Sequence, residues 1–221
     1  MYGQTPTLPI TEIVRDVQRL PSRESLAWLG VGAALAALAH PVDRRTSDAL
    51  GAPAWLDGVF EPGETIGGAR LQMGSAATVF TLGHLTRSPR VTRIGADLLR
   101  AQLLSQGITA AVKMSVGRDR PDGTEFSFPS GHTSVTFASA TVIQRHFGWK
   151  AGIPAYGVAA YVAASRINEQ RHFLSDVAFG AAIGIVTGRT VTIGRGNGRF
   201  AVAPTPVHGG VGVSLSWLAR H

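Results

Sequence analysis

The 221-residue chain contains no cysteine. This absence excludes a disulfide framework, a thiolate nucleophile, a zinc-thiolate centre and an iron-sulfur cluster, because all of these need cysteine sulfur. Aromatic residues make up only 7% of the chain and charged residues 16%, whereas 44% is hydrophobic. A chain this apolar can bury enough surface to offset the entropy lost on folding, so a disordered charged tail is excluded.

Lysine is also scarce, since Lys113 and Lys150 are the only two among the 21 basic residues. Arginine therefore carries nearly all of the positive charge, and the formal net charge is +7 with a sequence pI near 10.9. This surplus favours an anionic partner: nucleic acid, acidic lipid head groups or phosphorylated small molecules. Guanidinium groups suit bidentate recognition of phosphate. A general bias against lysine explains most of these arginines equally well.

A clear membrane-spanning run is missing too. A spanning helix needs about 20 consecutive apolar residues, and the best candidate, residues 25–42, falls just short. The same stretch resembles a secretory signal with Ala37-Leu38-Ala39 as a cleavage site, but acidic residues precede it. With a mean hydropathy of +0.13, three alternatives stay open: a membrane-embedded bundle, an exported protein and a soluble helical bundle.

The length favours a single domain with one core. We expect an N-terminal arm at 1–25, a mainly α-helical bundle of about six helices at 26–189 and a β-like tail at 190–221. Helices are predicted over residues 25–42, 71–86, 94–116, 131–147, 153–165 and 173–188, and a short amphipathic turn over 11–20. Residues 43–68 are rich in Asp, Pro and Gly and are predicted to form a loop.

The predicted tail, residues 190–221, differs in its residue pattern from the helical segments before it. Residues 190–193 and 199–203 flank a Gly-rich turn at 194–198, and apolar residues alternate with small or polar ones over 211–217. Alternation with a period of two is typical of strands. We therefore expect a small β-hairpin-like appendage on the helical body.

Polar residues interrupt the apolar segments at three places. In the first, residues 113–121, Lys113 and Arg120 are seven apart and would project from nearly the same helix face. Pro121 disfavours the helical conformation at Arg120, which places this arginine at a helix end or on a loop. Taken alone, the pair also fits two solvated cations at a helix C-terminus.

The second place is Pro129-Ser130-Gly131-His132, before a predicted helix. Ser130 is a good N-cap, and Gly131 allows a ligand to approach the backbone. Free N–H groups and the positive end of the helix dipole form an anion site there. An ordinary capped helix with a surface histidine explains this segment alone equally well.

The third place contains Ser165-Arg166, His172 and Asp176. His172 and Asp176 are four apart, so on a helix the carboxylate can accept a hydrogen bond from one imidazole nitrogen and leave the other as a free lone pair. This arrangement is expected of a nucleophile or general base, although surface His–Asp pairs are common. Together, the three places supply cations, backbone donors, a nucleophile and an acid, which is what phosphate ester cleavage needs.

The spacing of these residues resembles the three-part signature of the type 2 phosphatidic acid phosphatase family, which shares its site with the vanadium-dependent haloperoxidases. The resemblance covers roughly residues 70–188. It implies that His172 attacks phosphorus, that Asp176 orients His172 and that His132 protonates the leaving group. It implies no metal and no other cofactor. The residues that it assigns to the phosphoryl oxygens are Lys113, Arg120, Ser130, Gly131 and Arg166.

The leading hypothesis is therefore a phosphatase acting on a lipid phosphate or pyrophosphate, in the cell membrane with its site facing the periplasm or the outside. A soluble periplasmic acid phosphatase with the same site is the alternative. A haloperoxidase is disfavoured because such enzymes are usually much longer. A nucleic-acid-binding protein is disfavoured because the arginines are scattered and aromatics are few. The sequence does not identify the leaving group or the oligomeric state.

Overall fold

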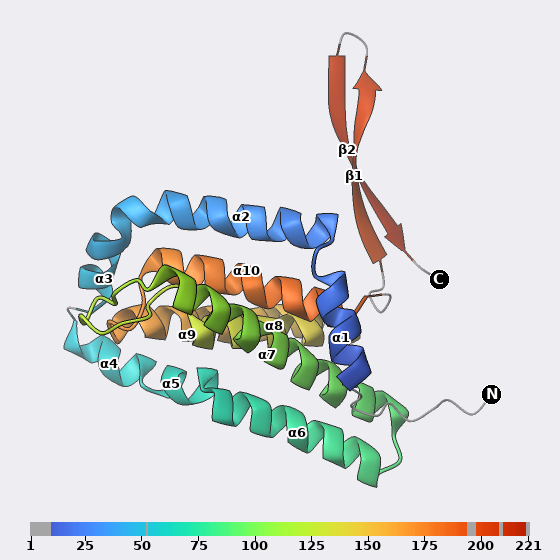
Figure 1. Ribbon diagram of the computed structural model, residues 1–221, viewed down its shortest axis with the longest axis horizontal. Helices are drawn as coiled ribbons and strands as arrows, with labels where there is room; N and C mark the ends of the chain where they lie inside the picture. Colours follow the sequence, from blue (N-terminus) through green and yellow to red (C-terminus); the bar gives the residue numbers. More distant parts are fainter. Residues whose placement is uncertain (1–9, 52, 194–197, 208–209, 220–221) are drawn as a thin grey trace.

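The structure is a computed structural model that describes residues 10–51, 53–193, 198–207 and 210–219. Figure 1 shows long helices lying side by side, with α10 between α2 and the other long helices. The helices are α1 (Ile10–Arg19), α2 (Arg23–Ala39), the 3-10 turn η1 (His40–Val42), α3 (Asp43–Gly51), α4 (Ala54–Phe60), α5 (Pro62–Gly67), α6 (Ala69–Leu85), α7 (Pro89–Val116), α8 (Gly131–Phe147), α9 (Trp149–Asn168) and α10 (Leu174–Val191). The mainly α-helical class is confirmed.

Helix α10 packs closely on α8 because three glycines, each four residues after the last, face it. A Cβ at Gly180 would lie 2.7 Å from the Ser130 carbonyl oxygen, and one at Gly188 would lie 2.6 Å from Cβ of Thr141. Gly184, between them, meets α8 in the same way. Small residues at this spacing let helix backbones approach one another, and this approach brings the start of α10 to the start of α8.

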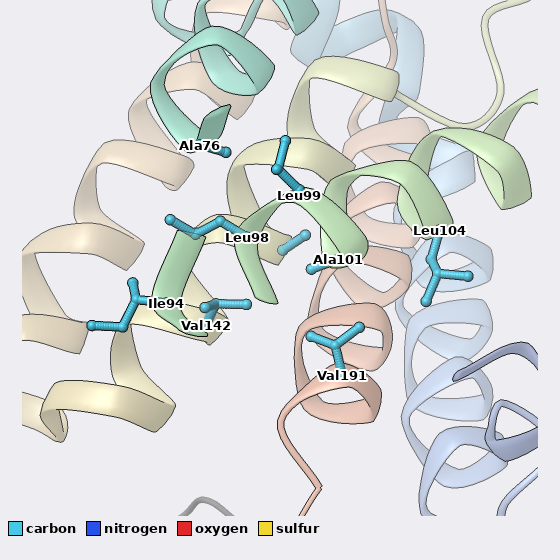
Figure 2. Packing of buried hydrophobic residues seen from close by; sticks show 9 residues of the cluster. Ala76, Ile94, Leu98, Leu99, Ala101, Leu104, Val142 and Val191 are labelled. Atoms are coloured by element: carbon cyan, nitrogen blue, oxygen red, sulfur yellow. The ribbon is translucent and has the colours of Figure 1, made fainter. Parts of the chain in front are cut away.

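The apolar core lies at the middle of the bundle. Figure 2 shows side chains from α6, α7, α8 and α10 in contact around Ala101, which is fully buried. Next to this core, in the first half of α7, the buried Arg100 binds Asp16 of α1 at 2.7 Å and Asp97 at 2.5 Å. This ion pair attaches α1 to the bundle.

The outer helices α2 and α6 bury little of their surface. Only Ser25, Gly32 and Ala36 of α2 are buried, and outward side chains such as Leu38 and Leu85 are 76% and 75% exposed. Among the described residues, two helical segments are long and apolar enough to cross a membrane, Arg23–Gly51 and Leu174–Val191. The first of these is mostly exposed and the second mostly buried.

The prediction of a loop over 43–68 is wrong, because α3, α4 and α5 occupy that segment. Pro53 is the N-cap of α4, and Pro62 lies in the first turn of α5. Proline is tolerated at helix starts because its missing N–H would have no partner there. The prolines that indicated a loop therefore separate short helices, and Figure 1 shows these helices running down one end of the bundle.

The predicted strand at 190–193 is also wrong, since α10 continues to Val191. The hydroxyls of Thr190 and Thr192 donate to the carbonyls of Val186 and Gly188, at 2.8 and 2.7 Å, which extends the helical bonding. The paired strands also do not flank the predicted turn at 194–198. Strand β1 (Gly198–Val207) pairs antiparallel with β2 (Gly210–Ala219), Gly198 opposite Ala219. Residues 194–197 lie outside the described residues.

Candidate active site

The first group of site residues lies where α7 ends. Gly117 terminates the helix in the left-handed conformation (φ 58°), and its N–H donates to the Lys113 carbonyl. Lys113 is thus in the last turn, where its ammonium donates to the carbonyls of Phe126 and Ser127. These bonds tie the loop between α7 and α8 to the end of α7, so Lys113 orders the loop that carries Arg120.

The second group lies at the start of α8. Ser130 is the N-cap, and its hydroxyl oxygen accepts from the N–H of Thr133 at 3.4 Å and from the Thr133 hydroxyl at 3.0 Å. The Ser130 N–H donates to the Asp176 carbonyl at 3.1 Å, which joins the second polar segment to the third. Gly131 and His132 follow in the first turn, as the sequence predicts.

The third group lies between α9 and α10. The His172 N–H donates to the carbonyl of Arg166 at 3.1 Å, and the imidazole is buried. Nδ1 of His172 lies 3.7 Å from Oδ2 of Asp176. The two side chains therefore lie next to each other, at a distance longer than a hydrogen bond.

The Asp176 carboxylate accepts hydrogen bonds from groups other than His172. Oδ2 accepts from the Phe173 N–H at 2.8 Å and from the Ser127 hydroxyl, and Oδ1 accepts from Arg118 at 2.8 Å. These bonds come from the loop before α8, from the start of α10 and from the loop after α7. The carboxylate is thus fixed beside His172 by groups from several parts of the chain.

The buried Arg166 and the half-buried Arg120 each have inaccessible guanidinium nitrogens that make no hydrogen bond to the described residues. The Arg166 side chain is 2% exposed and pairs with Glu169 through Nη2. In the part of the chain that the structure describes, its Nε and Nη1 and the Nε of Arg120 have no hydrogen-bond partner. Buried donors without acceptors are costly. An anion between these groups would satisfy them.

The electrostatics of the site favour a neutral imidazole at His172. Burial lowers the pKa of His172, and the nearby cations Lys113 and Arg120 act in the same direction, against the effect of Asp176. Burial lowers the pKa of His132 to about 4, and the charges of Arg166, Arg120 and Lys113 act in the same direction. The predicted cations therefore surround both histidines, and they create a positive potential where a phosphoryl group would bind.

A model of the PAP2 superfamily matches residues 95–199, a range that contains all three polar segments. The chain belongs to the PAP2 superfamily. Its resemblance to the type 2 phosphatidic acid phosphatases is thereby confirmed. A lipid A 1-phosphatase of Porphyromonas gingivalis is 45% identical over 89 residues, which are 38% of this chain and 20% of that protein. The chain thus matches only about a fifth of that curated relative's length.

Two solved structures share the PAP2 fold of this chain. One is a transmembrane PAP2-type phosphatidylglycerolphosphate phosphatase from Bacillus subtilis, with a TM-score of 0.63 and 21% identity over 80% of this chain and 94% of that one. The other is LpxE from Aquifex aeolicus, with a TM-score of 0.58 and 21% identity over 68% of this chain and 94% of that one. At this identity the likeness concerns the fold.

Sequence reasoning missed several residues of the PAP2 site. Arg118 donates to Asp43 as well as to Asp176, both at 2.8 Å, and its guanidinium lies 4.3 Å from the centre of the Phe173 ring. Asp43 also accepts from the Ser175 N–H at 2.8 Å and from the Ser175 hydroxyl at 2.6 Å. Arg118 lies two residues before Arg120 in the first polar segment, so the sequence could have indicated it. Nothing in the sequence links Asp43 to the site.

Helix α5 is a further part of the site that the sequence did not indicate. A Cβ at Gly67 would lie 2.5 Å from Cγ1 of Val162 and 3.0 Å from Cδ2 of His132. A Cβ at Gly63, one turn earlier, would overlap the side chain of Ser165. The two glycines thus bring α5 against α9 and against the imidazole of His132, and the helix covers this side of the site.

Proposed function

We propose that this PAP2 protein is a metal-independent phosphatase, and that it removes the terminal phosphoryl group of a lipid phosphate or pyrophosphate through a phosphohistidine at His172. The observation that carries the proposal is the set of buried guanidinium nitrogens of Arg166 and Arg120 that have no partner among the described residues; both charges act on His132, and that of Arg120 also acts on His172. The similarity to a lipid A 1-phosphatase and the fold of a phosphatidylglycerolphosphate phosphatase support the choice of substrate class.

In the first step, Nε2 of His172 attacks phosphorus in line with the leaving oxygen. A P–N bond forms, the P–O ester bond breaks, and His132 gives its proton to the departing alkoxide. Asp176 holds the Nδ1 side of His172 and stabilises the positive charge that develops on the imidazole. Burial and the nearby cations lower the pKa of His132 to about 4 in the free protein, so His132 takes up its proton when the negative phosphoryl group binds beside it and offsets these charges.

In the second step, water attacks the phosphohistidine. His132, now neutral, accepts a proton from the water as the P–N bond breaks, and inorganic phosphate leaves. His172 recovers its lone pair, and His132 recovers its proton for the next cycle. The same pair of histidines therefore serves both half-reactions without net consumption of a proton on the enzyme.

The remaining predicted residues form the phosphate cradle. Arg120 and Arg166 supply the unpaired donors, and Lys113 supplies charge from the end of α7. The N–H of Gly131 lies at the start of α8, where the helix dipole favours an anion. The Ser130 hydroxyl caps the same turn. Fixed donors of this kind stabilise the charge of the transition state without reorganisation.

We further propose that the bundle lies in the membrane. The outward faces of α2 and α6 are apolar and bury little against the rest of the protein, whereas a soluble alternative would expose these faces to water. Six exposed arginines, at positions 15, 19, 23, 87, 90 and 93, lie on α1, at the start of α2, on the turn before α7 and in the first turns of α7, at the end of the bundle opposite the site. Because basic residues favour the cytoplasmic side, the site would face the periplasm or the outside.

The test measures inorganic phosphate released from phosphatidic acid in mixed micelles and from a soluble aryl phosphate. We expect turnover of both by the wild-type protein and none by His172→Ala. Turnover by His172→Ala at the wild-type rate would contradict the nucleophile assignment. A carbonate wash of expressing cells tests the location: retention in the membrane pellet supports an embedded bundle, and release contradicts it.

A further inference from the structure

Two cavities adjoin at the corner where α2 turns into α3. The first has a volume of about 510 Å³ and a charged lining that includes Arg44, Asp119 and Arg120. The second has a volume of about 730 Å³. His40 and Arg118 line both of them. The two spaces therefore adjoin at His40 and Arg118, and the charged one reaches Arg120 of the proposed phosphate cradle.

The charged cavity contacts the cradle through Arg120. This arginine lines the cavity, has an unpaired buried Nε and acts electrostatically on both site histidines. On the opposite wall, Arg44 and His40 are exposed and belong to no other described interaction of the site. A phosphoryl group held by Arg120 would thus have its ester substituent directed toward polar, partly cationic walls.

The second cavity is mainly apolar. Ala36 and Ala37 form its wall on α2, and Val116, at the end of α7, lines it as well. Phe128 also lines it and stacks on Phe179, with 5.0 Å between the ring centres. Because the alanine side chains of α2 are small, they leave this cavity unfilled. The walls offer few hydrogen-bonding groups apart from those at the mouth shared with the charged cavity.

We propose that these cavities together form the leaving-group subsite, in which the charged cavity takes the polar part next to the scissile phosphate and the apolar cavity takes the start of a hydrocarbon chain. This assignment rests on the proposed phosphatase function and extends it. A soluble phosphomonoester would use the cradle and the charged cavity only. An apolar cavity next to the charged one thus favours a substrate that carries a lipid chain.

The test fills the apolar cavity and compares two substrates. Ala37→Trp places a large ring against Val116 and Phe128, where the chain would lie. We expect kcat/KM for dioleoyl phosphatidic acid in mixed micelles to fall about tenfold, the loss expected when about two methylene groups are no longer buried. We expect kcat/KM for a soluble aryl phosphate to stay within about twofold, because the cradle is untouched.

Leu38→Trp is the matched control, because it adds the same ring on the next residue of α2, which is 76% exposed and lines neither cavity. It should behave as wild type with both substrates. An unchanged rate of Ala37→Trp on the lipid, or an equal loss on both substrates, would overturn the subsite. Failure of the underlying function looks different: the wild-type protein would then hydrolyse neither substrate.

A chain-length series gives a second, independent readout. In the wild type, kcat/KM should rise from dihexanoyl to dioleoyl phosphatidic acid as more of the chain becomes buried. Ala37→Trp should flatten this dependence while leaving the dihexanoyl rate nearly unchanged. The same slope in wild type and variant would show that the chain lies elsewhere and would overturn the proposal.

Discussion

Asp43 and Asp176 accept hydrogen bonds from the two terminal nitrogens of one guanidinium, that of Arg118, each at 2.8 Å. Asp43 begins α3 and is buried, and Asp176 lies in the first turn of α10 beside His172. Arg118 therefore couples the corner between α2 and α3 to the carboxylate that faces His172, the proposed nucleophile. This coupling makes Asp43 a positioning residue, which acts on His172 through Arg118 and Asp176.

Replacing Asp43 with Asn should lower kcat with little change in KM. Loss of a hydrogen-bond partner that orients a site residue typically lowers activity about 10- to 100-fold. Asp43 is separated from His172 by both Arg118 and Asp176, so we expect kcat to fall about tenfold. Removal of a negative charge also disfavours the imidazolium, so the acid limb of the pH profile should move to lower pH. Steady-state kinetics across pH measure both effects.

Asp48→Asn, which changes an exposed carboxylate of the same helix, is the control for a general effect on α3. If Asp43→Asn and Asp48→Asn had the same kcat and the same acid limb, Asp43 would play no part in positioning.

The pH dependence of the wild-type enzyme should reflect the lowered pKa of His172. Attack requires the neutral imidazole, and activity is lost as pH falls through the pKa of that group. Because burial lowers this pKa, the acid limb of kcat/KM should lie below about pH 6.5, the ordinary value for histidine. An acid limb at or above that value, measured with the aryl phosphate, would contradict a neutral buried nucleophile.

Replacing Arg166 together with its partner Glu169 should lower activity without lowering stability. Its unpaired, buried donors are costly in the free protein, and replacing a buried ion pair with uncharged side chains is often neutral or stabilising. We expect the double variant Arg166→Met/Glu169→Gln to unfold at the wild-type temperature or above. Its kcat should fall by about 10²- to 10³-fold, because a charged donor to the transition state is lost.

The control for Arg166 is Arg171→Met, which removes a 44% exposed guanidinium whose only ion-pair partner among the described residues is Asp122. Exposed pairs contribute little, so both stability and kcat should be nearly unchanged. If the double variant had the wild-type kcat, Arg166 would not belong to the phosphate cradle.

Two glycine substitutions should act in opposite directions. Gly63→Ala in α5 would force a methyl group into the side chain of Ser165, and overpacking of this kind costs about 1–3 kcal/mol. Gly58→Ala in α4 meets nothing within 4 Å, so the helix should gain about 0.5–1 kcal/mol from the alanine. Thermal unfolding measures both changes. Equal unfolding temperatures for the two variants would mean that α5 does not pack as described.

The long helices were predictable because their apolar content and their N-caps are local properties. Ser130 caps α8 and Gly117 ends α7 through contacts within a few residues, so the chain around them predicts both boundaries. The segment 43–68 was misassigned for the opposite reason. Its short helices are held by distant partners, as when Gly67 meets Val162 on α9, and composition alone does not report such contacts.

The assignment to the PAP2 superfamily follows from the order and spacing of His132, Arg166, His172 and their neighbours, which resemble the signature of that family. The sequence alone was sufficient for this assignment, and the roles of the individual residues are predictions. Only the tertiary structure decided that Asp43 joins the site, that α5 covers His132 and that an apolar cavity adjoins the cradle. Burial, hydrogen-bond saturation and the shape of a cavity depend on segments remote in the chain, and they appear only when those segments pack together.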